Sequence, residues 1–141
     1  LLTGSRGERD FVERIRMGTR EPSRVVNSAG ELTLRELLAL LKKASVFVSN
    51  DSGPMHLACL VDVPIVGLFF AETPVLFGPI TERAITIAPA LYSIPLFTVY
   101  TGKNAQKMRN LASEVVTIQE VMAGIDKMIR EPQAFEHHSV N

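Results

Sequence analysis

The chain has 141 residues, with 15 basic and 15 acidic side chains, 46% hydrophobic residues, one cysteine and no tryptophan. The high apolar fraction and absence of net charge exclude a disordered chain, and the balanced charge argues against a nucleic-acid binder with a broad basic surface. The longest apolar run, residues 63–71, is too short to span a bilayer, and a single cysteine excludes a disulfide framework and fits a reducing compartment.

The first residues are typical of the end of a strand. Leu1 and Leu2 are followed at once by Thr3 and Gly4, which favour a turn. We therefore expect the strand to begin upstream, so that the 141 residues are a piece of a longer protein. On this interpretation residues 1–131 form one N-terminally truncated domain, and residues 132–141 form a flexible tail.

Three helices are predicted to begin at the same motif, a Ser or Thr followed three residues later by Glu, which is typical of a capping box. The last of them has an apolar stripe at helical spacing, so one of its faces is expected to pack on a core. The three motifs are Ser5–Glu8, Thr33–Glu36 and Thr117–Glu120, and the helices that they open run over residues 8–17, 34–43 and 118–129.

Four short strands are predicted between the helices, at residues 24–27, 45–49, 64–70 and 84–88. Two of them contain continuous apolar runs, at residues 46–48 and 65–69, which are typical of strands buried on both faces of a parallel sheet. Strands that alternate with helices indicate βαβ units, and hence a Rossmann-like, doubly wound parallel α/β sheet. The stretch 87–111 lacks a clear pattern and is predicted to be mostly loop.

The segment 49–56 is the best candidate for a binding loop. It follows an apolar strand and precedes a predicted helix over residues 55–61, and open α/β sheets bind ligands at the carboxyl ends of their strands. Pro54 suits the first helical position, and Gly53 allows the backbone to turn tightly before it. Free backbone N–H groups at such a helix start can bind a phosphate.

Each polar residue of this loop also has a purely structural explanation. Asp51 or Ser52 could be only the N-cap of the helix, worth ~1 kcal/mol. His56 lies in the first helical turn, where the helix dipole disfavours a protonated imidazole, so it is either a neutral donor to a ligand oxygen or a packed structural residue. No Lys or Arg occurs in residues 44–81, so a bound phosphate would need positive charge from elsewhere in the fold or from a segment outside the chain.

At this loop the chain resembles glycosyltransferase family 9, the ADP-heptose:lipopolysaccharide heptosyltransferases and their relatives. The resemblance is carried by residues 50–58 (NDSGPMHLA) and 63–69 (VPIVGLF), and it extends over residues 1–129. It implies a GT-B fold of two Rossmann-like domains, of which this chain matches only the C-terminal, donor-binding one. The proposed catalytic base of the family is an Asp of the N-terminal domain, so no catalytic residue is expected in this chain.

The resemblance also implies a reaction. It is the metal-independent, inverting transfer of heptose from an ADP-sugar to a lipopolysaccharide core or related glycolipid, in the bacterial cytoplasm or at the inner face of the inner membrane. Asp51 would hold heptose hydroxyls, whereas Ser52 and His56 would hold the diphosphate. The donor-binding residues that the resemblance implies are Glu8, Leu32, Asp51, Ser52, Gly53, Pro54, His56 and Thr73.

Outside the loop these assignments have rivals. Leu32 would lie near the adenine and Glu8 near the ribose, but the capping box with Ser5 explains Glu8 equally well. After the strand at 64–70 the family continues with Gly, Pro and Thr, where this chain has residues 70–72 (FAE). Thr73 could still donate its hydroxyl. Two other functions are compatible with the sequence: half of a GT-B-type sugar-nucleotide epimerase, or a non-catalytic nucleotide- or phosphate-binding Rossmann-like module.

Overall fold

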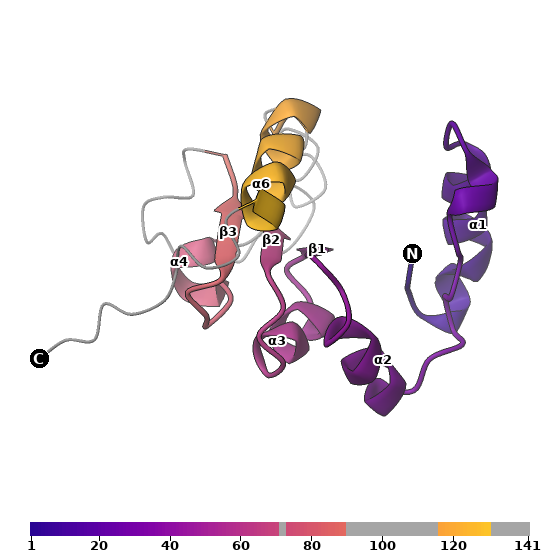
Figure 1. The fold of residues 1–141 in the computed structure, drawn as a ribbon, viewed down its shortest axis with the longest axis horizontal. Helices are drawn as coiled ribbons and strands as arrows, with labels where there is room; N and C mark the ends of the chain where they lie inside the picture. The colour runs from indigo at the N-terminus through magenta and orange to yellow at the C-terminus, as the bar shows by residue number, and fades with distance from the viewer. Residues whose placement is uncertain (71–72, 90–115, 131–141) are drawn as a thin grey trace, which may run out of the picture. The chain divides into compact units, whose positions relative to one another are not determined.

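The computed structural model of the chain describes residues 1–70, 73–89 and 116–130, in two compact units (Figure 1). Unit 1 is Leu1–Ala39 and unit 2 is Leu40–Asn141. The predicted tail lies outside the described residues, as does most of the predicted loop at 87–111.

Unit 1 is built around the helix α1, Arg9–Met17, which follows a 3₁₀ turn, η1, at Arg6–Glu8. The helix ends at Gly18, as the sequence predicts. The backbone N–H of Gly18 donates to the carbonyl oxygens of Arg14 and Ile15, at 3.0 and 3.1 Å.

The strand predicted at residues 24–27 is largely wrong. Its start lies in a second 3₁₀ turn, η2, at Pro22–Arg24, and only Asn27 pairs, in an isolated parallel bridge with Leu2. Proline fixes φ near −65° and lacks an N–H group, so Pro22 favours the turn and cannot donate to a ladder.

Unit 2 contains a three-stranded parallel sheet in the order β1-β2-β3, which confirms the predicted parallel α/β arrangement. The helix α2, Leu34–Leu41, begins in unit 1 and ends in unit 2. The described elements of unit 2 that follow it are β1 (Phe47–Asn50), α3 (Gly53–Cys59), β2 (Ile65–Leu68), α4 (Pro74–Phe77), β3 (Ala84–Ile87) and α6 (Ile118–Arg130).

Helices cover both faces of this sheet. A Cβ placed on Gly124 of α6 would lie 3.5 Å from Val66 Cγ1 of β2, so α6 packs closely on that face. A Cβ placed on Gly67, the next residue of β2, would lie 3.2 Å from Met55 Sδ of α3. Successive strand residues point to opposite faces, so α6 and α3 lie on opposite sides of the sheet, as a doubly wound fold requires (Figure 1).

The burial of the two apolar strands differs. The side chains of Ile65 and Val66 in β2 are fully buried, as predicted. In β1, however, exposure alternates along the strand and Val48 is 39% exposed, so the prediction of burial on both faces is wrong there. Val48 pairs with Val66, which lies on the α6 face, but α6 packs mainly on β2 and β3. Within the described residues, β1 is therefore an incompletely covered edge strand.

All three predicted capping boxes form. One carboxylate oxygen of each Glu accepts from the backbone N–H of the Ser or Thr three residues earlier, at 2.7–2.8 Å, and from its hydroxyl, at 2.6–2.8 Å. In the Thr33 and Thr117 boxes, the Glu N–H also donates back to the threonine Oγ1. Among the helices that the structure describes, none is long and apolar enough to cross a membrane.

Candidate functional site

The candidate loop lies at the carboxyl edge of the sheet, between β1 and α3. The N–H of Asp51, the first residue after β1, donates to the carbonyl oxygen of Leu68 at the end of β2, at 3.2 Å. The helix α3 begins at Gly53, two residues earlier than predicted, and ends at Cys59. The loop is thus short and fixed by the sheet on one side and the helix on the other.

Asp51 and His56 face each other across this loop. Their Oδ1 and Nε2 atoms are 3.6 Å apart, and their side chains are 25% and 48% exposed, respectively. The distance is longer than a hydrogen bond, so each group keeps hydrogen-bonding capacity for a ligand. Because α3 starts two residues after Asp51, its first turn brings His56 back toward the carboxylate.

The N-cap explanation of Asp51 and Ser52 is not realised in hydrogen bonds. Ser52 occupies the N-cap position, but its side chain makes no cap hydrogen bond. Its Oγ lies 3.1 Å from the Oγ of Ser49 instead, and Ser49 Oγ donates to the carbonyl oxygen of Asn50. The sequence gave no reason to single out Ser49, beyond its place in a polar run.

The helix start offers fewer free N–H groups than the sequence suggests. The N–H groups of Met55 and His56 both donate to the carbonyl oxygen of Ser52, at 3.0 and 3.4 Å, and Pro54 has no N–H. Among the described residues, no partner contacts the N–H of Gly53. Backbone binding of a phosphate at the start of α3 would therefore depend mainly on Gly53.

Gly53 is not required by the chain itself. A Cβ placed on it would meet no atom within 4 Å, and its φ is not positive. The tight turn for which the sequence suggested glycine is therefore absent. What glycine provides at this position is open space next to Asp51 and Ser52.

Thr73 has a structural role. Its side chain is only 1% exposed, and its Oγ1 accepts from the N–H of Val75, which caps α4. Phe70 follows β2 and is half-buried, and residues 71–72 lie outside the described part of the chain. The proposed contact of Thr73 with a donor stays a prediction.

In unit 1, Glu8 forms its capping box and keeps one carboxylate oxygen free of hydrogen bonds from the described residues. Oε2 accepts from both the N–H and the hydroxyl of Ser5, which lowers the pKa of the Glu8 carboxyl. The turn is held by Gly30, which has a φ of +74° and donates its N–H to the carbonyl oxygen of Gly4 at 2.9 Å. Leu32 is half-buried in the same unit.

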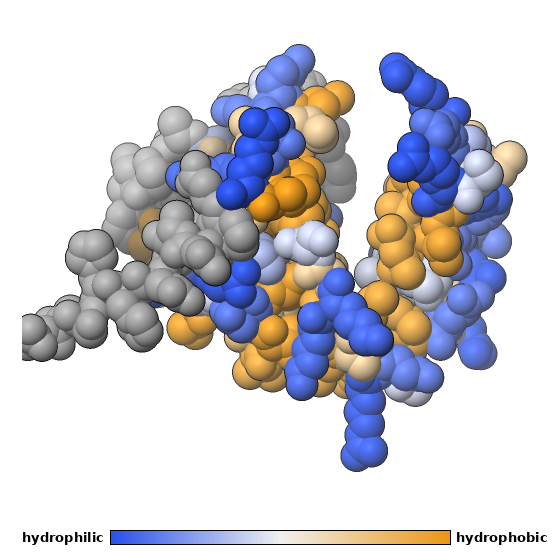
Figure 2. Space-filling model, in the orientation of Figure 1, coloured by the Kyte–Doolittle hydropathy of each residue, from blue (hydrophilic) through white to orange (hydrophobic). Residues whose placement is uncertain are grey.

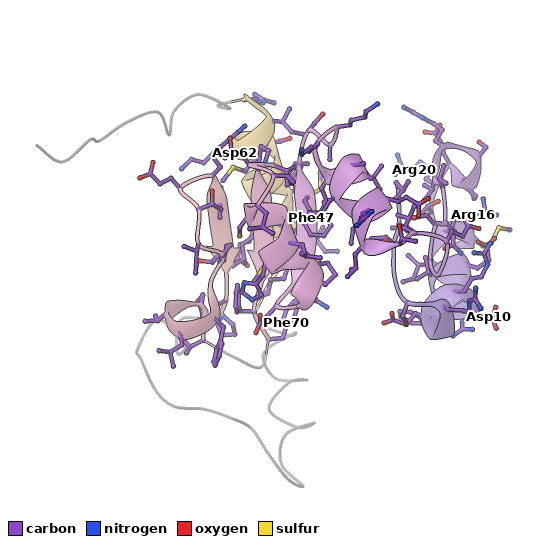
Figure 3. All side chains as sticks on the ribbon, turned by 90° about the horizontal axis from the view of Figure 1, so that it is seen from below. Asp10, Arg16, Arg20, Phe47, Asp62 and Phe70 are labelled. Carbon is purple, nitrogen blue, oxygen red and sulfur yellow. The ribbon has the colours of Figure 1, made fainter. Side chains whose placement is uncertain are left out.

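A pocket of about 420 Å³ lies at the opposite, amino edge of the sheet. On its rim, Nη1 of Arg83 donates to both the carbonyl oxygen and Oδ2 of Asp62, at 2.8 and 2.9 Å. These bonds fix the turn before β2, where Asp62 has a φ of +55°. Figure 3 shows Asp62 and Phe70 at opposite ends of unit 2. The polar groups of this pocket therefore serve the fold.

No cluster of three His, Cys, Asp or Glu side chains suited to a metal ion occurs within the described ranges.

Comparison with known proteins gives a consistent group of matches. The sequence model of glycosyltransferase family 9 (heptosyltransferase) matches residues 1–103. Lipooligosaccharide heptosyltransferase 2 of Haemophilus ducreyi is 33% identical over 90 residues, which cover 61% of this chain and 26% of that protein. Lipopolysaccharide heptosyltransferase 3 of Escherichia coli is 28% identical over 119 residues, which cover 84% of this chain and 33% of that protein. The chain thus spans only a quarter to a third of these relatives.

Two solved structures share the fold. ADP-heptose LPS heptosyltransferase II of E. coli has a TM-score of 0.72 and 24% identity, covering 94% of this chain and 37% of that one. The family 9 glycosyl transferase of Veillonella parvula has a TM-score of 0.69 and 22% identity, covering 92% of this chain and 36% of that one. Both matches support the predicted Rossmann-like α/β class.

Proposed function

This chain belongs to glycosyltransferase family 9, the heptosyltransferases, and from that membership we propose that it is the donor-binding part of an inverting heptosyltransferase. The full-length protein would transfer heptose from an ADP-linked donor to a lipopolysaccharide core or related glycolipid. We place the reaction in the cytoplasm or at the inner face of the inner membrane. The general base would come from another domain of the full-length protein.

The observation that carries this proposal is the pair of Asp51 and His56 at the carboxyl edge of the sheet. A carboxylate accepts hydrogen bonds from sugar hydroxyls, and a neutral imidazole donates one to an oxygen. Their 3.6 Å separation leaves both side chains available to a ligand, and neither has a capping role that would explain it. We assign Asp51 to the heptose hydroxyls and His56 to the diphosphate.

Ser52, Gly53 and Pro54 support the same assignment. The Ser52 hydroxyl is not used as a cap, and Gly53 leaves room for a phosphate to reach its N–H. Pro54 lies in the first turn of α3, where its fixed φ stabilises the helix start.

Glu8 and Leu32 are the proposed nucleoside contacts in unit 1. The capping box orients the Glu8 carboxylate through Oε2, so Oε1 can accept a hydrogen bond from a ribose hydroxyl. Leu32 would contact the adenine. In this arrangement the cap and the ribose contact are compatible, because they use different oxygens of one carboxylate.

Calorimetric titration of the full-length protein with ADP-, UDP- and GDP-sugars tests the proposal. We expect ADP-heptose to bind, and UDP- and GDP-sugars to bind at least about tenfold more weakly, a difference of about 1.4 kcal/mol. Preference for a UDP-sugar would favour an epimerase-like protein, and binding without turnover of any glycolipid acceptor would favour a non-catalytic module.

A further inference from the structure

The outer edge of β1 is an open hydrogen-bonding edge within the described residues. The N–H of Phe47 donates to Pro64, and that of Asp51 donates to Leu68, both toward β2. Because N–H groups alternate in direction along a strand, those of Val48 and Asn50 point the other way. No described residue pairs with them.

This edge lacks the features that protect natural edge strands. Such strands carry Lys, Pro, a bulge or inward-pointing charges that prevent pairing with another strand. The four residues of β1, Phe47–Asn50, include none of these. Val48 is instead apolar and exposed, and Figure 2 shows that apolar side chains reach the surface of unit 2 around α3 and beside α6. The strand therefore has the composition of an interior strand.

We infer that the outer edge of β1 takes one more parallel strand, supplied by a segment of the protein that precedes residue 1. In the common doubly wound order 3-2-1-4-5-6, three strands in sequence order form one half of the sheet, and the first strand lies next to the fourth. The order β1-β2-β3 matches strands four to six. The parallel bridge between Leu2 and Asn27 matches strands two and three, so the first strand would precede Leu2 in the sequence.

The added strand would complete the candidate site. Parallel strands end at the same edge of a sheet, so the loop after the new strand would lie next to Asp51 and Ser52. No Lys or Arg occurs in residues 44–81, and this loop is therefore the place from which positive charge can reach a bound diphosphate. The inference concerns the sheet itself and does not depend on which donor binds.

Residue-resolved amide exchange by NMR tests the inference, comparing residues 1–141 with the full-length protein. We expect the amides of Val48 and Asn50 to exchange about 100-fold more slowly in the full-length protein, because a strand ladder protects them. The amides of Phe47 and Asp51 point toward β2 and should be protected in both proteins, which makes them internal controls. Equal, fast exchange of Val48 and Asn50 in both proteins would overturn the inference.

A proline pair provides an independent test. Proline is tolerated where an N–H faces solvent, and it breaks a ladder where the N–H is bonded. V48P should therefore lower the unfolding midpoint of the full-length protein but hardly change that of residues 1–141, whereas S49P should lower both. If V48P is tolerated in the full-length protein, or if protection of Val48 in residues 1–141 rises with protein concentration, the partner strand is not the upstream segment.

Discussion

At the residue scale, the polar side chains of the loop after β1 are unused by the fold. Asp51 and Ser52 precede a helix without capping it, and Gly53 leaves a volume that no protein atom fills. The three capping-box glutamates are the opposite case, since each has its hydrogen bonds satisfied within its own turn. Residues that local structure does not explain are the ones to test for ligand binding.

Asp51→Asn should reduce donor binding much more than stability. Loss of a charged acceptor for sugar hydroxyls should weaken binding by about 1.5–3 kcal/mol, or roughly 10- to 150-fold. The unfolding midpoint should stay nearly unchanged, because Asp51 caps nothing. Calorimetry and thermal unfolding of the full-length protein measure the two effects, with Asp126→Asn on the exposed side of α6 as the matched control. A stability loss of ~1 kcal/mol with unchanged binding would instead indicate a capping role.

Two glycine substitutions separate space for a ligand from space for the core. Gly53→Ala should leave stability unchanged, since its Cβ meets no atom within 4 Å, but should weaken ADP-sugar binding if a phosphate approaches its N–H. Gly67→Ala should destabilise by about 1–3 kcal/mol, because its Cβ would lie 3.2 Å from both Met55 Sδ and Phe69 Cε2. Chemical denaturation and donor titration of the two variants distinguish these effects. Unchanged donor affinity in Gly53→Ala would remove Gly53 from the proposed site.

At the element scale, features set by local sequence were predictable and features set by distant contacts were not. The capping boxes and the end of α1 at Gly18 depend on residues within one turn, and all of them form as predicted. The strand expected at 24–27 failed because Pro22 favours a turn. The burial of β1 failed because it depends on which helix and which strand lie beside it, and no pattern within residues 46–48 carries that information. The site loop was located correctly because carboxyl strand ends follow from topology alone.

The capping box of α6 can be tested by Thr117→Ala. The change removes the hydroxyl that accepts from the Glu120 N–H and donates to its carboxylate, so we expect a loss of ~1 kcal/mol in the free energy of unfolding. Gln119→Ala, at an exposed position one residue before Glu120, is the matched control. Equal midpoints for both variants would show that α6 is held by its packing on β2 and β3 alone.

The link between α1 and Asn27 should depend on pH. Hydrogen bonds from Arg16, and then from Asn27, lower the pKa of the Glu13 carboxyl from 4.5 to about 2. A lowered folded-state pKa stabilises the protein above pH 4.5, and this contribution is lost as the pH falls from 4.5 toward 2. The Glu13→Gln variant should therefore lose less stability than the parent over that interval in pH-dependent denaturation. Parallel losses in the two proteins would show that the Glu13 carboxylate is not linked to folding.

At the scale of the whole molecule, the described chain has a binding loop without the other parts of a transferase. The candidate loop lies at a sheet edge, no Lys or Arg occurs in residues 44–81, and the chain spans a quarter to a third of its curated relatives. A sheet edge with one acidic and one imidazole side chain can hold a sugar nucleotide weakly. It has no obvious means of activating an acceptor hydroxyl, which needs a positioned base.

We therefore predict that residues 1–141 alone do not transfer heptose and bind ADP at best weakly. Without a cation near the diphosphate, the loop can offer only hydroxyl, imidazole and backbone donors, and charge-assisted hydrogen bonds are roughly twice as strong as neutral ones. Turnover of ADP-heptose with a lipopolysaccharide acceptor, measured side by side for residues 1–141 and the full-length protein, checks this, and full-length Asp51→Asn provides a control with the site impaired but the domain present. Transfer by residues 1–141 would mean that the base and the charge both lie within this chain, and the search for them would move to residues 90–115 and 131–141.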